Sequence, residues 1–212
     1  MNIKIFVVNP NEVNCYLLWD ETNEAVLIDC GAWAAEERER IRRFVQSEGL
    51  TLKHYLNTHL HFDHIFGNAY VEQTFGLRAE ASDKDWSWAE TIAERVARFG
   101  IRYSESVPPL GRILRDGDEV KFGNETIKAL AVPGHSPGSL AFYIEKEKAV
   151  FTGDALFCQS IGRTDFPDSD HYRLITTIRE KLLTLPEDTT VYPGHDRETT
   201  IGFEKAYNMF LK

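Results

Sequence analysis

The order of strand-like and helix-like runs is the feature that most constrains the fold. Runs rich in β-branched and aromatic residues, punctuated by Asn, Pro, Asp and Gly, are typical of short strands. They occur in two groups, at residues 3–8, 14–20, 24–31 and 52–58, and at residues 118–124, 126–134, 139–145, 148–154 and 190–194. Charged segments with apolar residues at helical spacing accompany each group. This order predicts two sheets packed together and covered by helices, in one domain of residues 1–212.

Five segments are predicted to be helices from the spacing of their apolar residues. The segment 34–49 places Ile41, Phe44 and Val45 on one face and ends at Gly49. The others are 69–75, with Asn68 as its N-cap, roughly 84–99, 171–185 and 202–212. Each is short enough to cover one face of a sheet.

The charge balance restricts the kind of partner. The chain has 24 basic and 33 acidic residues, which gives a net charge of −9. Nucleic acids and anionic membranes attract basic surfaces, so the sequence predicts neither as a partner. No apolar run reaches the length of about 20 residues that a membrane span requires. A small anionic substrate held by one or two local arginines is compatible with this charge, and the oligomeric state is left open.

Cysteine usage and the N-terminal sequence predict a cytoplasmic protein. Cys15, Cys30 and Cys158 are widely separated and include no CxxC pair, which suits a reducing compartment better than a disulfide framework. They are expected to be small buried hydrophobic residues. The start of the chain lacks the charged, apolar and small-residue regions of a secretion signal.

The segment THLHFDHIFG, residues 58–67, carries the strongest chemical signal. Three histidines and one aspartate occupy four of the six positions from His59 to His64. Neutral imidazole and carboxylate are good ligands for Zn²⁺ and also suit Fe and Mn. Ligand-type side chains so close together have no packing purpose, and their clustered charge is stabilised by a nearby cation. The segment therefore predicts a metal site.

Three further ligand-type residues follow strand-like runs. They are His135 in VPGHSPG, Asp154 in FTGDA and His195 in YPGHD. Strand ends can hold functional side chains out into a shared site. In the first segment, the spacing of His59 and His61 suits one ion, and the two ligands that begin the next helical turn suit a second. The predicted ligand sets are His59, His61, His135 and Asp154 for one ion, and Asp63, His64, His195 and Asp154 for the other.

Simpler interpretations apply to several single residues. A lone His after a Pro-Gly turn is commonly a surface or capping residue, and Asp154 alone would be a turn cap. These positions gain a ligand role only together with the histidine-rich segment. His54, in the preceding strand, and His171, at a helix start, are not expected to bind metal. Trp86 and Trp88 are expected to pack within their helix, with an aromatic wall over the site as the alternative.

Four motifs in a fixed order, THLHFDH, PGHSPGS, FTGDALF and YPGHD, resemble the metallo-β-lactamase superfamily. The resemblance is closer to its glyoxalase II branch, the hydroxyacylglutathione hydrolase-like proteins. The segments SIGRTDFPDSD and TTIGFEKAYNMFL resemble the short bacterial members of that branch. The resemblance runs from NCYLLWD to the C-terminus. Its motifs are highly specific for the superfamily and much less specific for the substrate.

The resemblance implies an α/β fold, a four-layer αββα sandwich, with a dinuclear site at one edge of the two sheets. It assigns as ligands the seven residues predicted above, and it matches Asp29 in LIDCG to an aspartate that orients the ligands from behind. The chain departs from the branch in two places. It ends about one helix after His195, without the added helical region that helps glyoxalase II enzymes bind glutathione. Asp196, together with GRTDF, also looks like the persulfide dioxygenases of the superfamily, which use one iron.

The predicted activity is hydrolysis of a thioester of the hydroxyacylglutathione or S-lactoylglutathione type. Two divalent metal ions, with Zn favoured and Fe or Mn as alternatives, would provide a bridging hydroxide near neutral pH. Asp63 and Asp154 would orient that hydroxide as catalytic residues. Arg163 is the predicted clamp for a substrate carboxylate, with an ion pair to Asp165 as the equally weighted alternative.

Other activities are kept as alternatives. The main one is a mononuclear-iron persulfide dioxygenase that uses His59, His135 and Asp154. Lactone and β-lactam hydrolysis rank below thioester hydrolysis, because SIGRTDFPDSD resembles the glyoxalases. A metal-binding protein without activity is disfavoured, because every ligand position of the superfamily is filled.

Overall fold

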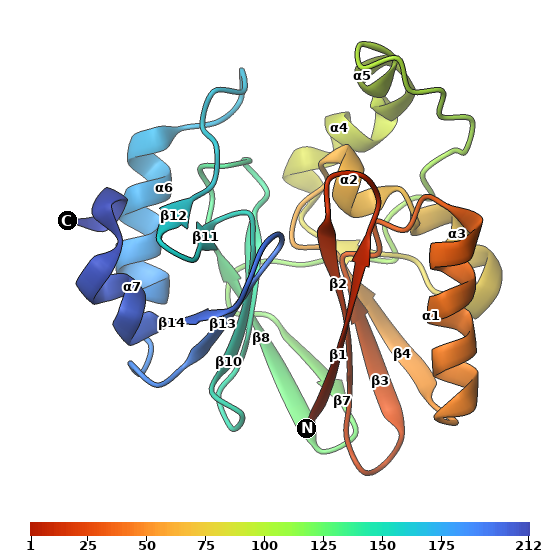
Figure 1. Cartoon of the computed structure of the whole chain (residues 1–212), viewed down its shortest axis with the longest axis horizontal. Helices are drawn as coiled ribbons and strands as arrows, with labels where there is room; N and C mark the ends of the chain where they lie inside the picture. Colours follow the sequence, from red (N-terminus) through yellow and green to blue (C-terminus); the bar gives the residue numbers. More distant parts are fainter.

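The computed structural model describes residues 1–212 and contains two six-stranded mixed sheets that face each other (Figure 1). The first sheet has the order β1 (Asn2–Val8), β2 (Val13–Trp19), β3 (Glu24–Ile28), β4 (Thr51–Leu56), β5 (Glu80–Ala81) and β6 (Arg112–Ile113). The second has the order β14 (Thr199–Thr200), β13 (Thr190–Pro193), β10 (Ala149–Gly153), β9 (Leu140–Ile144), β8 (Glu125–Ala131) and β7 (Glu119–Phe122). A small hairpin pairs β11 (Leu156–Phe157) with β12 (Ser160–Ile161).

Helices cover the outer face of each sheet (Figure 1). On the side of the first sheet lie α1 (Ala35–Ser47), α2 (Phe62–Ile65), α3 (Asn68–Phe75), the 3₁₀ turn η1 (Asp83–Asp85), α4 (Trp86–Glu90) and α5 (Ile92–Ala97). On the side of the second lie α6 (His171–Thr177) with its π-helical continuation η2 (Ile178–Leu182), α7 (Ile201–Tyr207) and η3 (Met209–Leu211). The predicted four-layer αββα sandwich is confirmed. None of its helices combines the length and apolarity needed to cross a membrane.

The alternation of side chains along the strands fills three apolar layers. Leu18 and Ile28 point between the two sheets, where they pack in one cluster with Phe142 of the second sheet. Leu17 and Leu27, each one residue earlier, belong to the cluster under α1. Because successive side chains of a strand point to opposite faces, strands covered on both sides read as continuous apolar runs.

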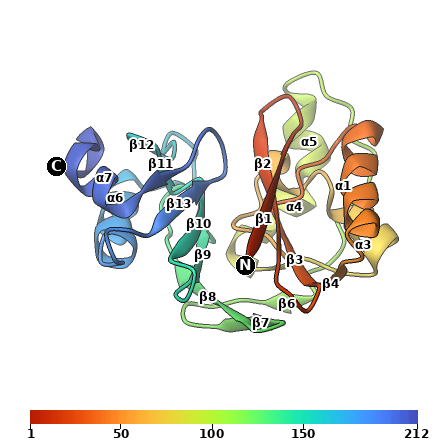
Figure 2. The ribbon, with the colours of Figure 1, turned by 60° about the horizontal axis from the view of Figure 1, so that its bottom comes forward.

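Hydrogen bonds join the two halves at the bottom of the molecule and at the opposite edge. At the bottom of the molecule, the β7–β8 hairpin reaches under the first sheet, and Asn124 N–H donates to Asp20 Oδ2 at 2.6 Å (Figure 2). At the opposite edge, Val13 forms an isolated antiparallel bridge with His195, and Asn14 N–H donates to Gly194 O at 2.7 Å. The second contact brings loops of both sheets to the same edge.

Three predicted helices are shorter or more irregular than expected. The segment 84–99 is interrupted at Thr91, whose hydroxyl donates back to Ser87 O at 2.6 Å and competes with the helical hydrogen bonds. The segment 171–185 turns π-helical at Ile178. The last helix ends at Tyr207, because Asn208 takes an extended conformation and caps the following 3₁₀ turn.

The prediction that Asn68 caps a helix is wrong. Asn68 is the first residue of α3, and the cap position is Gly67. The Asn68 side chain instead accepts from the Tyr55 hydroxyl at 2.5 Å and donates to Asn57 Oδ1 at 3.0 Å. Gly67 is required because an added Cβ would lie 2.5 Å from the Cys30 carbonyl oxygen. The position of this helix start depends on the close packing of Gly67 against Cys30, a contact that cannot be seen in the sequence.

Gly76, which ends α3, offers a test of backbone strain alone. Its φ is +71°, and an added Cβ would meet no atom within 4 Å. We expect Gly76→Ala to lower the free energy of unfolding by about 1 kcal/mol, because only glycine adopts this left-handed conformation freely. Gly76→Asn should lose less, since Asn tolerates it better. Urea denaturation measures both, and equal stability of the Ala variant and wild type would contradict the expectation.

Candidate metal centre

All seven predicted ligand residues lie where strands of the two sheets end. His59 and His61 follow β4, Asp63 and His64 lie in α2, His135 follows β8, Asp154 follows β10, and His195 follows β13. The strands β3 and β4 are parallel, and so are β10 and β13. Parallel strands end at the same edge of a sheet, so each pair delivers its loops to one place. The facing of the two sheets then brings both sets of loops together.

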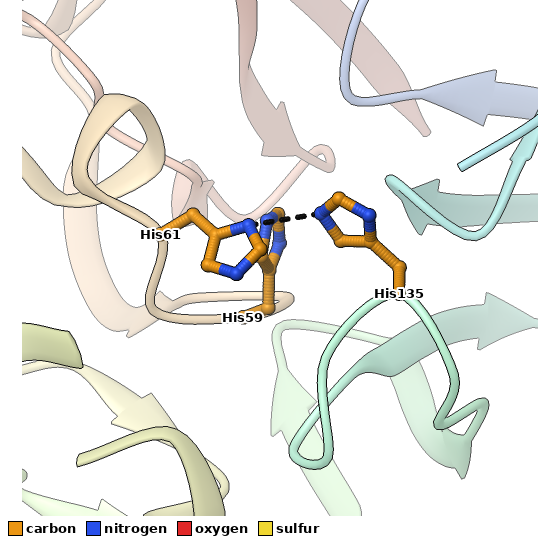
Figure 3. Close-up of side chains that lie close together, drawn as sticks. All are labelled: His59, His61 and His135. Carbon is orange, nitrogen blue, oxygen red and sulfur yellow. Dashed lines mark hydrogen bonds between the residues drawn. The ribbon is translucent and has the colours of Figure 1, made fainter. Parts of the chain in front are cut away.

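The first group of ligand-type side chains is His59, His61 and His135, and all three are buried. Their candidate ligand atoms lie within 4.8 Å of one another. His61 Nδ1 and His135 Nε2 are 2.9 Å apart, and the three rings converge from two loops that are distant in sequence (Figure 3). The arrangement matches three of the four residues predicted for one ion.

Two further groups complete the cluster. They are His59 with His64 and Asp154, and Asp63 with His64 and His195. The Asp154 carboxylate lies beside ligand-type residues that were predicted for each of the two ions. Its oxygens lie 3.3, 3.6 and 3.5 Å from the Nε2 atoms of His64, His135 and His195 respectively. Asp154 therefore occupies the position predicted for a shared ligand.

Hydrogen bonds from behind fix the orientation of three rings. His135 Nδ1 donates to Arg163 O at 2.9 Å, and His195 Nδ1 donates to Asn11 O at 2.8 Å. His64 Nδ1 lies 3.0 Å from Asp29 Oδ2. A neutral imidazole whose Nδ1 carries the proton keeps a lone pair on Nε2. In all three residues Nε2 is therefore the atom free to bind metal.

Asp29 is a buried acceptor that connects two ligand segments. Its carboxylate accepts from Thr58 N–H at 2.8 Å and from the Thr58 hydroxyl at 2.6 Å, in addition to its contact with His64. Its φ of +52° turns the chain sharply after β3. Asp29 thus fixes the start of the His59 loop and the ring of His64 together.

The charges of the cluster shift several pKa values. Burial, reinforced by neighbouring imidazoles, holds the pKa of His59 and His61 well below the ordinary value, and the Arg95 charge adds to this at His61. The pKa of His64 is raised despite its burial, because carboxylates of Asp154 and Asp29 lie on either side of the ring. Burial alone would raise the pKa of Asp154, but the charge of His64 and contacts with His195 hold it well below the usual range.

The residues present fit divalent metal ions. His59 Nε2, His64 Nε2 and Asp154 Oδ1 are buried and make no hydrogen bond. Leaving a buried polar atom unpaired costs about 1–3 kcal/mol, so such atoms in a native site need a partner. Neutral imidazoles and carboxylates are the donor set of Zn²⁺ and Fe²⁺ sites. The three groups overlap at His59 and at His64. Asp154 also lies near His135 and His195, an arrangement that suits two neighbouring ions.

Sequence reasoning missed two residues that position this cluster. Asn11 Nδ2 donates to Asp63 Oδ2 at 3.0 Å, so the β1–β2 turn holds a predicted ligand as well as the ring of His195. Asp85 accepts from the Ser136 hydroxyl and from Gly138 N–H, both at 2.6 Å, and so fixes the loop after His135. The segment NPNEVN gives only a turn signal for Asn11, and Asp85 lies in a segment expected to be an ordinary helix.

An aromatic wall, formed by Trp88 and Phe166, stands beside the cluster. The Trp88 ring centroid is 4.2 Å from that of His61, and the Phe166 centroid is 5.1 Å from His61 and 5.6 Å from His135. Trp88 and Phe166 contact each other edge to face at 5.7 Å. For Trp88 the alternative interpretation therefore applies, whereas Trp86 packs against an apolar cluster near α2 as expected.

The remaining predicted or excluded residues lie outside the cluster. Arg163 makes a two-point ion pair with Asp165, at 3.0 and 2.7 Å, and its side chain is 71% exposed. Its role toward a substrate stays a prediction. His54 contacts Glu80 at 2.5 Å, and His171 contacts Thr164. The cysteines are free, with Cys15 and Cys30 buried and Cys158 half-buried.

Comparison with known proteins gives concordant results. The sequence model of the metallo-beta-lactamase superfamily matches residues 8–195. Hydroxyacylglutathione hydrolase GloC of Haemophilus influenzae is 39% identical over 212 residues, covering 100% of this chain and 98% of that protein.

Two solved structures are similar over their whole length. The crystal structure of the B3 metallo-beta-lactamase BLEG-1 has a TM-score of 0.91 at 36% identity and covers 100% of both chains. The crystal structure of TTHA1623 in a di-iron-bound form has a TM-score of 0.87 at 34% identity and covers 98% of this chain and 100% of that chain.

Proposed function

Because the chain belongs to the metallo-beta-lactamase superfamily, we propose that it is a metallo-hydrolase that cleaves thioesters of the hydroxyacylglutathione type. The observation that carries the hydrolase activity is the cluster of seven ligand-type side chains centred on Asp154. The choice of a thioester as the substrate is supported by the full-length 39% identity to hydroxyacylglutathione hydrolase GloC.

The cluster would hold two ions. His59, His61 and His135 would bind one, Asp63, His64 and His195 the other, and Asp154 would be shared. When bound, such ions lower the pKa of a water molecule from 15.7 to about 7 and polarise a carbonyl group. Zn²⁺ is favoured by the donor set, and iron is supported by the di-iron form of TTHA1623.

The protein's own residues orient the attacking water and shield the site. The carboxylates of Asp63 and Asp154 are acceptors that can hold a hydrogen of the attacking water, and Asn11 fixes Asp63. Trp88 and Phe166 limit solvent access beside His61. Phe166, which is half-buried, also offers an apolar surface to the substrate. The departing thiolate needs no strong general acid, because a thiol has a pKa of about 8.5.

A specific observation also favours β-lactam hydrolysis as a second candidate. BLEG-1, at 36% identity with a TM-score of 0.91, is described as a B3 metallo-beta-lactamase. Attack on a lactam carbonyl uses the same water and the same ligands. Its amine leaving group, however, must gain a proton, which a thiolate does not require. The proposed site provides more directly for a thioester.

Metal content and substrate preference test this proposal together. Purified protein should contain about two ions of Zn or Fe per chain, and it should hydrolyse S-lactoylglutathione with a higher kcat/KM than any cephalosporin. Near one iron per chain, with oxygen uptake on glutathione persulfide, would favour the mononuclear dioxygenase instead. A two-metal protein that opens cephalosporins and leaves the thioester intact would favour the second candidate.

A further inference from the structure

Two guanidinium groups flank the aromatic wall. The Arg95 guanidinium carbon lies 3.6 Å from the Trp88 ring centroid, and that of Arg163 lies 4.9 Å from the Phe166 centroid. The cations therefore stack on the two aromatic residues that contact His61. A substrate held at the metal cluster and lying along this wall would meet one of them.

The two arginines differ in how their charge is balanced. Arg163 is bound at two points by Asp165. Arg95 has no carboxylate within 4.0 Å, and its one side-chain hydrogen bond runs from Nε to the Thr91 hydroxyl at 2.8 Å. The two terminal nitrogens of Arg95 donate to no protein acceptor. These are the nitrogens that form parallel contacts with a carboxylate.

Arg95 is also held in a defined orientation. The Thr91 hydroxyl fixes Nε from within the helical segment, and the indole of Trp88 fixes the plane of the guanidinium. Trp88 is anchored in turn, because its Nε1–H donates to Asp168 Oδ2 at 2.5 Å. A half-buried, preoriented guanidinium loses little freedom on binding an anion, so it binds more tightly than a mobile surface arginine.

The position of Arg95 fits the far end of a bound thioester. The Trp88 ring contacts both groups: its centroid lies 3.6 Å from the Arg95 guanidinium carbon and 4.2 Å from the His61 centroid. Arg95 is half-buried, whereas Trp88 is buried beneath it. A substrate whose thioester carbonyl lies at the metal cluster could therefore extend past His61 and place its charged end at the guanidinium. The net charge of the protein is −9, which disfavours anions on average. An unpaired cation beside the site would therefore favour a negatively charged substrate over a neutral one.

From these contacts we propose that Arg95 binds a carboxylate of an anionic thioester and so determines specificity for charged over neutral thioesters. The proposal rests on the thioester hydrolase function and extends it to the substrate's charge. A merely structural arginine that covers Trp88 would give no such discrimination, and this difference can be measured.

The test compares two substrates with the same acyl group on the metal-loaded enzyme. S-lactoylglutathione carries carboxylates, and S-lactoyl-N-acetylcysteamine carries none. Arg95→Met should raise KM for the anionic substrate about ten- to thirtyfold, as expected for a charge-assisted hydrogen-bonded pair, with kcat nearly unchanged. For the neutral substrate, kcat/KM should stay within about twofold.

Arg98→Met is the matched control. Arg98 is exposed, caps the same helix, and makes no ion pair, so its replacement removes the same charge from the same segment. Both substrates should be cleaved by this variant as by wild type. Arg95→Lys should restore only part of the affinity, because lysine keeps the charge and loses the planar two-point contact.

Three results would overturn the proposal. Equal losses on both substrates would assign Arg95 a structural role, and no loss on either would remove it from the binding surface. A loss confined to the anionic substrate in Arg163→Met, and absent in Arg95→Met, would assign the contact to Arg163.

A binding measurement separates this proposal from the proposed function. Glutathione should quench the tryptophan fluorescence of metal-loaded wild type at lower concentration than that of Arg95→Met, by about tenfold. Equal dissociation constants would contradict the role of Arg95 even if the enzyme cleaves thioesters. If wild type cleaves no thioester but shows the tenfold difference, the proposed function fails and the anion site stands.

Discussion

Replacing Asp154 by asparagine is expected to lower kcat/KM by about a thousandfold. The Asp154 oxygens lie within 3.3–3.6 Å of the Nε2 atoms of His64, His135 and His195, so its charge serves both halves of the cluster. Asparagine keeps the size but removes that charge. Bound metal supplies several kcal/mol of transition-state stabilisation, and each 1.4 kcal/mol or so is tenfold in rate.

Metal content shows whether the loss arises as proposed. Asp154→Asn should contain fewer than two ions per chain after dialysis, and its far-ultraviolet circular dichroism should match that of wild type. Asp188→Asn is a suitable control, because Asp188 is exposed and pairs only with Lys148, away from the cluster. An Asp154→Asn protein that binds two ions and retains full activity would contradict the shared role of Asp154.

The second large effect is expected at Asp29, which is buried and contacts the ring of His64. Asp29→Asn should weaken metal binding about tenfold to a hundredfold, the usual cost of losing a group that orients a ligand. The free energy of unfolding of the metal-free protein should also fall, by about 2 kcal/mol, because an amide nitrogen would face the donors of Thr58 or His64. Asparagine tolerates the positive φ of this position, so backbone strain is not added.

Competition with a chelator measures the metal affinity, and urea denaturation without metal measures the stability. The two readouts separate an effect on the ligands from an effect on folding. Asp188→Asn again serves as the control, with both quantities unchanged. If Asp29→Asn loses stability but binds metal as wild type does, Asp29 stabilises the turn without orienting His64.

The layered fold could be predicted because apolar strand-like runs and amphipathic helical segments recur along the sequence. Continuous apolar runs such as those of β2 and β9 require cover on both faces, and the amphipathic segments supply it. The helix ends could not be predicted as well. Thr91 interrupts one helix through its own hydroxyl, and Gly67 starts another because it packs against Cys30. Both depend on contacts that a local pattern does not contain.

In the candidate site too, some residues could be predicted from the sequence and others could not. Seven ligand-type residues could be predicted because metal ligands are restricted to few residue types and because strand ends place them locally. Asn11 and Asp85 could not, since an asparagine in a turn and an aspartate near a helix start have many uses. Only their distances to Asp63 and to the loop of Ser136 identify them.

By itself, the sequence determined the layers of the fold and the side chains that can bind metal, because apolar periodicity and ligand chemistry are both local properties. Only the tertiary structure decided which histidines share a group and which arginine carries an unpaired charge. Arg163 forms an ion pair with Asp165, two residues away, whereas Arg95 stacks on Trp88 and pairs with no carboxylate. These partnerships depend on how the two sheets and their loops pack, and that packing sets distances between residues far apart in the chain.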